Sequence, residues 1–147
     1  LPCSPLPSPI SSSSNHGIYY VENHPTYATT LDRLFEHIEA RSIQVFTSTI
    51  TLTEVLVKPI RAGDQNLIAA YRDLLTQTEA VRLLALSPAI AEQAAHLRAR
   101  YQLRTPDSIQ LASALHASCQ AFLTNDRGLA RITDLRVLLV DDLEVDL

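Results

Sequence analysis

The segments RTPDSIQLASAL (104–115) and FLTNDRGL (122–129) decide the fold, because they predict a helix that leads into a buried strand and a turn. Thr105-Pro106 is typical of a helix start, and the residues after it extend the predicted helix to about Ser118. The segment 121–124 is short and mostly apolar, which is typical of a buried strand. The Asn-Asp-Arg-Gly that follows has the composition of a turn.

Strands and helices alternate on both sides of these segments. Strands are predicted at 43–50, 80–86 and 136–140, and helices at 51–60, 65–78 and 88–100. Pro59 should stop or bend the first of these helices, and Gly63-Asp64 should end it. A short helical turn is predicted at 129–132, and an amphipathic helix carries Leu31, Leu34, Phe35 and Ile38. This alternation predicts an α/β fold with a parallel sheet covered on both faces.

Length and composition predict one domain without a membrane anchor. The chain has 147 residues and a net charge of −4, so any RNA binding must rely on a local basic patch or on bound cations. Two cysteines form neither a disulfide framework nor a zinc site, and neither a membrane span nor a secretory signal is recognisable. We therefore expect a cytoplasmic protein. Residues 1–14 are rich in Pro and Ser and are expected to be disordered or atypical, and residues 15–147 form the domain.

Three carboxylates, Glu54, Asp107 and Asp126, stand where a strand passes into a helix or where a helix begins. Each has a structural explanation: Thr51 and Glu54 fit a capping box, Thr105 can cap the helix that contains Asp107, and Asp126 can belong to a turn. The carboxyl edge of an open α/β sheet is also where ligands bind. Oxygen ligands gathered there would suit Mg²⁺, so both interpretations stay open.

Four blocks resemble PIN domains, and VapC-like toxins in particular, in order and spacing: IYYVENHPTY (18–27), STITLTEVLVKPI (48–60), RTPDSIQLASAL and FLTNDRGL. The resemblance implies a three-layer α/β/α sandwich with a central, mostly parallel sheet. It also implies an endoribonuclease that depends on Mg²⁺ or Mn²⁺ and is restrained by a cognate antitoxin.

The resemblance further implies a set of site residues. Glu54, Asp107 and Asp126 match the family's second, third and fourth acidic positions and would hold the metal, with Thr124 and Asn125 supporting that edge by hydrogen bonds. The first acid is replaced by Ser13, in Ser13-Ser14-Asn15, and no first strand is recognisable before Ile18. Contacts with RNA phosphates, or with the neighbouring carboxylates, are expected of three basic residues: Lys58, Arg104 and Arg127.

Alternatives to a ribonuclease toxin stay open. Because Ser13 replaces an acid, the chain is also compatible with a degenerate PIN fold that serves as a binding or assembly module. A flap-type nuclease acting on DNA would need further helical elements, for which 147 residues leave no room. Apolar surface on the helices between residues 26 and 78 predicts self-association, most simply as a homodimer.

Overall fold

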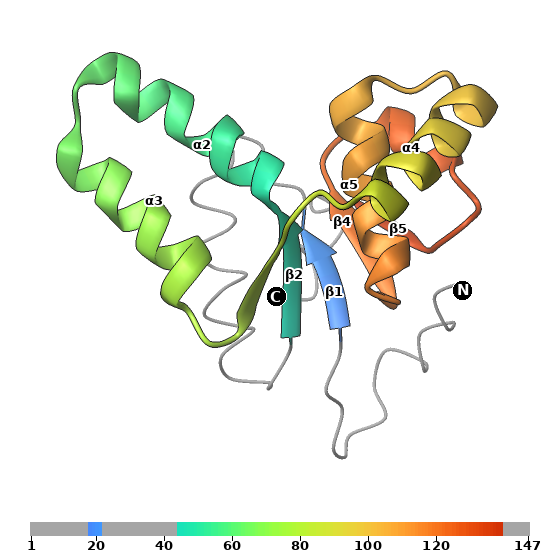
Figure 1. Cartoon of the computed structure of the whole chain (residues 1–147), viewed down its shortest axis with the longest axis horizontal. Coiled ribbons are helices and arrows are strands. Elements are labelled where there is room, and N and C mark those ends of the chain that lie inside the picture. The colour runs from blue at the N-terminus through green and yellow to red at the C-terminus, as the bar shows by residue number, and fades with distance from the viewer. Residues whose placement is uncertain (1–17, 22–43, 140–147) are drawn as a thin grey trace.

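The computed structural model describes residues 18–21 and 44–139, which form a five-stranded sheet with helices on both faces (Figure 1). The strands are β1 (Ile18–Val21), β2 (Gln44–Ser48), β3 (Val81–Leu84), β4 (Ala121–Thr124) and β5 (Val137–Leu139). The helices are α2 (Thr49–Ala62), α3 (Gln65–Gln77), α4 (Pro88–Tyr101) and α5 (Thr105–His116), with a 3₁₀ turn η2 (Arg127–Arg131).

All neighbouring strands in the sheet are parallel, in the order β3-β2-β1-β4-β5. β1 lies in the middle, where Tyr20 pairs with Phe46 of β2 and with Phe122 of β4. The chain builds outward from β1 to β3 on one side and then crosses to β4 and β5 on the other. In sheets of this kind, the crevice at the point where the strand order reverses is the usual ligand site.

The central strand lies later in the chain than the position at which the family resemblance places the first strand. No strand was recognisable before Ile18, and the structure forms the middle of the sheet from Ile18–Val21. Ile, Tyr, Tyr and Val all favour strands, and a central parallel strand must be apolar, whereas the Ser- and Pro-rich residues before Ile18 meet neither condition. The predicted helix around Leu31 to Ile38 and the N-terminal segment 1–14 lie outside the described residues.

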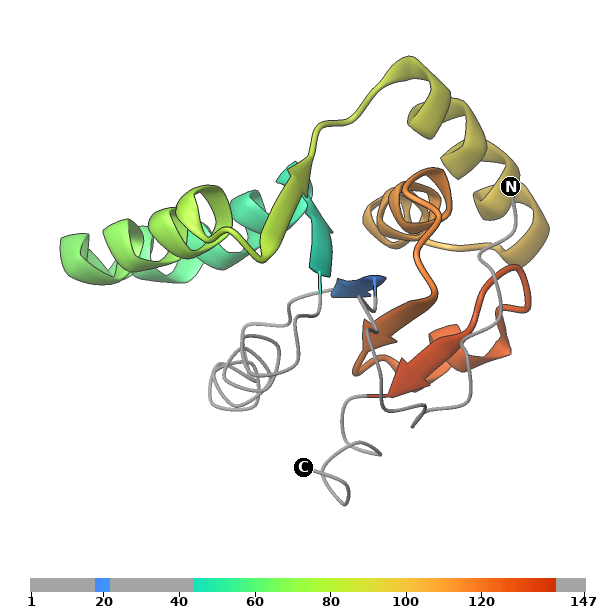
Figure 2. The same cartoon turned by 90° about the horizontal axis from the view of Figure 1, so that it is seen from below.

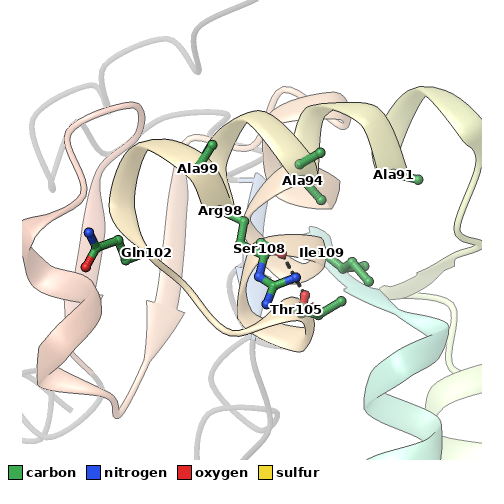
Figure 3. A pocket seen from close by; sticks show the side chains of 9 residues that line it. Ala91, Ala94, Arg98, Ala99, Gln102, Thr105, Ser108 and Ile109 are labelled. Atoms are coloured by element: carbon green, nitrogen blue, oxygen red, sulfur yellow. Dashed lines mark hydrogen bonds between the residues drawn. The ribbon is translucent and has the colours of Figure 1, made fainter.

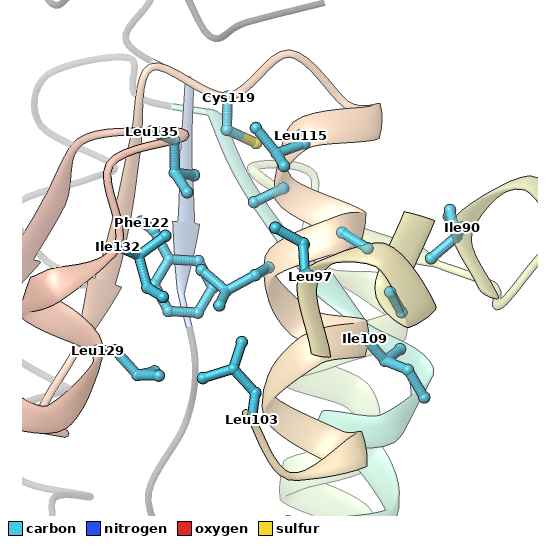
Figure 4. Packing of buried hydrophobic residues seen from close by; sticks show 14 residues of the cluster. Ile90, Leu97, Leu103, Ile109, Leu115, Cys119, Phe122, Leu129, Ile132 and Leu135 are labelled. Atoms are coloured by element: carbon cyan, nitrogen blue, oxygen red, sulfur yellow. The ribbon is translucent and has the colours of Figure 1, made fainter. Parts of the chain in front are cut away.

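Side chains of alternate strand residues enter two hydrophobic clusters, as the two-residue period of a strand requires. Phe122 belongs to the larger cluster, with residues of α4, α5 and η2 (Figure 4). The next residue, Leu123, belongs to the smaller cluster, with Val55 of α2 and Leu75 of α3. Figure 2 shows α4 and α5 together on one side of the strands and α2 and α3 as a pair on the other. The predicted three-layer α/β/α architecture is confirmed.

α2 and α3 form an antiparallel hairpin that extends away from the sheet (Figure 1). α2 runs three residues past the buried Pro59 and ends at Gly63, whose φ of 68° is in the left-handed region that glycine adopts without strain. Asp64 then caps α3 by accepting a hydrogen bond from the Leu67 amide. Within the described residues, no helix has both the length and the apolar character that a membrane crossing requires.

Candidate functional site

The three predicted carboxylates are on elements that begin at the carboxyl edge of the sheet. Glu54 is on α2, which follows β2 directly, and Asp126 follows β4 after one residue. Asp107 is in the first turn of α5, the helix that precedes β4. The site therefore lies on both sides of β1, where the order of the strands along the sheet reverses.

Asp107 is the most buried of the three carboxylates, with 5 % of its surface exposed. The sequence predicted Thr105 as the cap of this helix, but Thr105 is already helical and the capping position is Arg104, which makes no side-chain cap. Instead, the Arg104 guanidinium contacts both Asp107 carboxylate oxygens, with Nε–Oδ2 at 3.0 Å and Nη2–Oδ1 at 3.5 Å. Of the two alternatives for Arg104, the structure therefore contains the contact with the carboxylate.

Glu54 is half-buried in the second turn of α2, and the predicted capping box is wrong. The helix begins two residues earlier than Thr51, and Ser48 caps it by accepting a hydrogen bond from the Ile50 amide at 3.1 Å. Thr51 has a different role, because its hydroxyl is buried and accepts hydrogen bonds from Thr47 and Gln110.

The hydrogen bond from Gln110 Nε2 to Thr51 Oγ1, 3.0 Å long, ties α5 to α2 inside the core. Glu54 is three residues from Thr51 on α2, and Asp107 is three residues from Gln110 on α5. Helix residues three apart share a face, so both carboxylates are on the sides of the helices that this bond holds together. Gln110 and Thr51 position the site; the sequence did not point to Gln110, and it suggested only a capping role for Thr51. The available signal was a Gln inside the otherwise apolar run SIQLASAL.

Asp126 has the structural role that its turn sequence suggested. Its Oδ1 accepts a hydrogen bond from the Gly128 amide at 2.8 Å and caps η2. Its own amide donates to Oγ1 of the buried Thr124 at 3.0 Å, so Thr124 supports this edge as expected. The side chain is exposed, and its second oxygen, Oδ2, is compatible with an additional ligand.

Asn125 was expected to support the same edge by hydrogen bonding, but its side chain does not. Both the Nδ2 and the Oδ1 atoms are buried and, within the described structure, have no hydrogen-bond partner. A buried amide without partners costs about 1–3 kcal/mol of stability. Such a residue in a candidate site is typical of a group that serves a ligand rather than the fold.

Asn125→Leu is expected to leave the free energy of unfolding unchanged or to raise it by about 1 kcal/mol, because it removes the unpaired amide and keeps a similar side-chain shape. Urea denaturation of the two proteins measures this difference. The matched control is Asn66→Leu, at an exposed position of α3, which should change the stability by less than about 0.5 kcal/mol. A loss of more than 1 kcal/mol in Asn125→Leu alone would show that Asn125 is paired in solution.

The donor atoms at this edge are of the kind that a hard divalent cation prefers: carboxylate oxygens and the unpaired amide oxygen of Asn125. Too few of these ligands lie close together in the described part of the structure. Among residues 18–21 and 44–139, no three His, Cys, Asp or Glu side chains are close enough together to hold a metal ion. Ser13 and Asn15, at the family's first acidic position, lie outside the described residues.

Lys58 and Arg127, the two other basic residues predicted to contact RNA or carboxylates, are exposed and lie close in sequence to carboxylates of the candidate site. Lys58 follows Glu54 by one helical turn on α2, and Arg127, the first residue of η2, directly follows Asp126.

A shallow groove of about 600 Å³ lies elsewhere, between α4 and α5 (Figure 3). Alanines and Ile109 form most of its lining, and none of the three carboxylates borders it.

Comparison with known proteins gives the family. The model of the PIN domain matches residues 15–135, so the chain belongs to the PIN-domain family. A VapBC2 complex of Rickettsia felis bound to a promoter DNA fragment is similar, with a TM-score of 0.66, 17% identity and coverage of 83% of this chain and 98% of that one. A search among curated proteins gives no match.

Two further solved structures share the fold. A toxin-antitoxin complex of Klebsiella pneumoniae has a TM-score of 0.58 at 23% identity, with coverage of 84% of this chain and 97% of that one. VapC20 of Mycobacterium tuberculosis, a toxin that cleaves the sarcin-ricin loop, has a TM-score of 0.58 at 17% identity, with coverage of 80% and 98%.

Proposed function

We propose that this PIN-domain protein is a metal-dependent endoribonuclease and the toxin of a toxin-antitoxin pair. The observation that carries the proposal is the placement of Glu54, Asp107 and Asp126 on elements that start at one edge of the sheet, in a chain of this family. The similarity to VapC20, which cleaves the sarcin-ricin loop, supports RNA as the substrate. The similarity to VapBC complexes supports an antitoxin as the partner.

In this proposal Glu54, Asp107 and Asp126 would hold Mg²⁺ or Mn²⁺, which requires the three carboxylates to come closer together than they lie in the structure. When bound, the cation supplies an activated water and offsets negative charge on the phosphate. Arg104 neutralises Asp107 in the structure, and its side chain is 78% exposed, so it can leave the carboxylate at little cost. Once released, Arg104 contacts an RNA phosphate, together with Lys58 and Arg127.

Self-association would use the tip of the α2–α3 hairpin. Val57, Ile60 and Leu67 are 42%, 58% and 39% exposed there, which is unusual for large apolar side chains on one small projection. A second copy of the chain that packs on this tip would form the homodimer. The pair of toxin and antitoxin would act in the cytoplasm.

A second candidate function is that of a degenerate PIN fold that binds a partner without cleaving RNA. Two contacts favour this second function, because they already use carboxylate oxygens of the candidate site. Arg104 contacts both Asp107 oxygens, and Asp126 Oδ1 caps η2. Ser13 favours it too, because serine adds no negative charge at the family's first acidic position.

The test is cleavage of a mixed RNA pool in Mg²⁺ or Mn²⁺ and in EDTA, with the parent protein, Ser13→Asp and the matched control Ser11→Asp. We expect cleavage that EDTA abolishes, and a faster rate in Ser13→Asp than in the other two because one ligand is restored. Cleavage by Ser13→Asp alone would favour the second candidate for the parent chain. If no variant cleaves RNA in either metal, the nuclease proposal is wrong.

A further inference from the structure

Positive charge is concentrated in one part of the chain. Residues 98–136 contain six of the twelve Lys and Arg residues but only three of the sixteen Asp and Glu, a local net charge of +3 in a protein of net charge −4. Since the whole molecule repels polyanions, a surface that attracts them must lie where the positive charge is gathered.

Four arginines of this region surround the loop between α4 and α5, and we call them the arginine face: Arg98, Arg100, Arg104 and Arg131. All four side chains are exposed. Arg98 donates from Nε to the Leu103 carbonyl at 3.1 Å, and Arg131 donates from Nη2 to the Tyr101 carbonyl at 2.6 Å. These contacts hold Arg98 and Arg131 at the end of α4 and the loop, with Arg98 on the side of the α4–α5 groove and Arg131 on the side of η2, while Arg100 reaches Asp134.

Arg131 is held by two backbone carbonyl groups and by an aromatic ring. Besides the Tyr101 carbonyl, it contacts the Gly128 carbonyl through Nε at 3.1 Å, and its guanidinium lies 5.8 Å from the centre of the Tyr101 ring. The Arg100 guanidinium lies over the same ring at 5.9 Å. A guanidinium fixed in this way loses little further conformational entropy when it binds a phosphate.

The charges on the arginine face are only partly neutralised. Arg100 pairs with Asp134 at 3.2 Å and Arg104 with Asp107 at 3.0 Å, and in each pair the arginine side chain is exposed to solvent whereas the carboxylate is largely buried. Arg98 and Arg131 bind neutral carbonyl oxygens and, within the described part of the chain, form no ion pair. Two fixed positive charges are thus available to an anion.

The arginine face borders the carboxylates of the candidate site. Arg104 precedes Asp107 by three residues, and Arg131 ends the 3₁₀ turn that Asp126 caps. With a rise of about 2 Å per residue, the five residues from Asp126 to Arg131 span about 10 Å. Figure 4 shows Leu103, from the loop, beside Leu129, from η2, so the loop and the turn are packed together.

We propose that the arginine face binds the phosphates of a single-stranded RNA that extends from the candidate site, with Arg131 as its fixed contact. This inference rests on the proposed function, because the carboxylates place the reacting phosphodiester beside the face. Single-stranded RNA is flexible enough to run from the carboxylates over η2 to the loop between α4 and α5. The planar guanidinium group of arginine matches the geometry of a phosphate group. Nothing in the face reads bases, so binding is independent of sequence.

Fluorescence anisotropy of a labelled single-stranded RNA of mixed sequence, measured in EDTA, tests this inference apart from cleavage. Arg131→Gln is expected to raise the Kd about fivefold to tenfold and to make the plot of log K against log salt shallower by about 0.7, the loss of one phosphate contact. Arg131→Lys keeps the charge and should keep the slope. The matched control is Arg72→Gln, an exposed arginine on α3, which should bind like the parent.

Thermal melting of each variant shows whether it is folded, and Arg100→Gln provides a second measurement on the face if Arg131→Gln is not. Equal RNA affinity in the arginine-face variants and Arg72→Gln would overturn the inference. So would a loss of affinity confined to duplex DNA of the same length, or to an acidic peptide. Binding through Arg131 without cleavage would contradict only the nuclease proposal, whereas cleavage with Arg131-independent binding would contradict only this one.

Discussion

Asp107→Asn is expected to lower the rate of metal-dependent RNA cleavage by about 100-fold or more while the protein stays folded. The substitution keeps the shape of a side chain that is only 5% exposed and removes its negative charge. A neutral amide is a much weaker ligand for Mg²⁺ and does not balance the charge of the cation. The rate is measured on the RNA pool in Mg²⁺, with Ser13→Asp as the background if it is the more active protein.

The fold should tolerate Asp107→Asn, because the ion pair that it removes includes an Arg104 side chain that is 78% exposed and is worth at most about 1 kcal/mol. Asp73→Asn is the matched control, since Asp73 is exposed on α3, in the hairpin away from the arginine face. Cleavage by Asp107→Asn at the rate of Asp73→Asn would mean that Asp107 holds no metal.

Phe122→Ala is expected to lower the free energy of unfolding by about 3–5 kcal/mol. Phe122 is fully buried in β4, next to the central strand, and packs in the larger hydrophobic cluster with residues of α5 and η2. A domain of this size is stable by about 5–15 kcal/mol in total, so the variant should be close to unfolded at physiological temperature. The midpoint of urea denaturation measures the loss.

Leu86→Ala is the control for Phe122→Ala, because Leu86 is 46% exposed between β3 and α4 and its truncation opens no buried cavity. Its effect should stay within about 0.5 kcal/mol. If Phe122→Ala loses less than about 1 kcal/mol, the ring is not packed in the core as the structure describes.

Most of the fold could be predicted from the sequence, because its strands and helices differ in period and have clear end signals. Residues 121–124 were predicted as a strand and form β4, and Gly63 ends α2 as its composition indicated. The central strand was missed, since four residues give too short a pattern to separate a strand from part of a helix. Its position depends on pairing with β2 and β4, which a local pattern does not contain.

The residues assigned to the candidate site stay a prediction, and several of their local contacts differ from those that the sequence suggested. The capping box at Thr51 was wrong because a tertiary contact uses the same hydroxyl, which accepts a hydrogen bond from Gln110. The cap at Thr105 was wrong because the helix already includes Thr105 and its capping position is Arg104. The unpaired amide of Asn125 could not be foreseen, because burial without a partner is a property of the packed structure alone. Whether the three carboxylates share a metal stays a prediction.

The position of β1 also bears on how the chain folds during synthesis. β2, α2, α3 and β3 can pair with one another as soon as they have emerged from the ribosome, because each contacts its neighbour in sequence. The pairing of Tyr20 with Phe122 must wait for about a hundred further residues. Until then β1 has an unpaired edge, and a chain stalled before β4 exposes an edge that can pair with another chain.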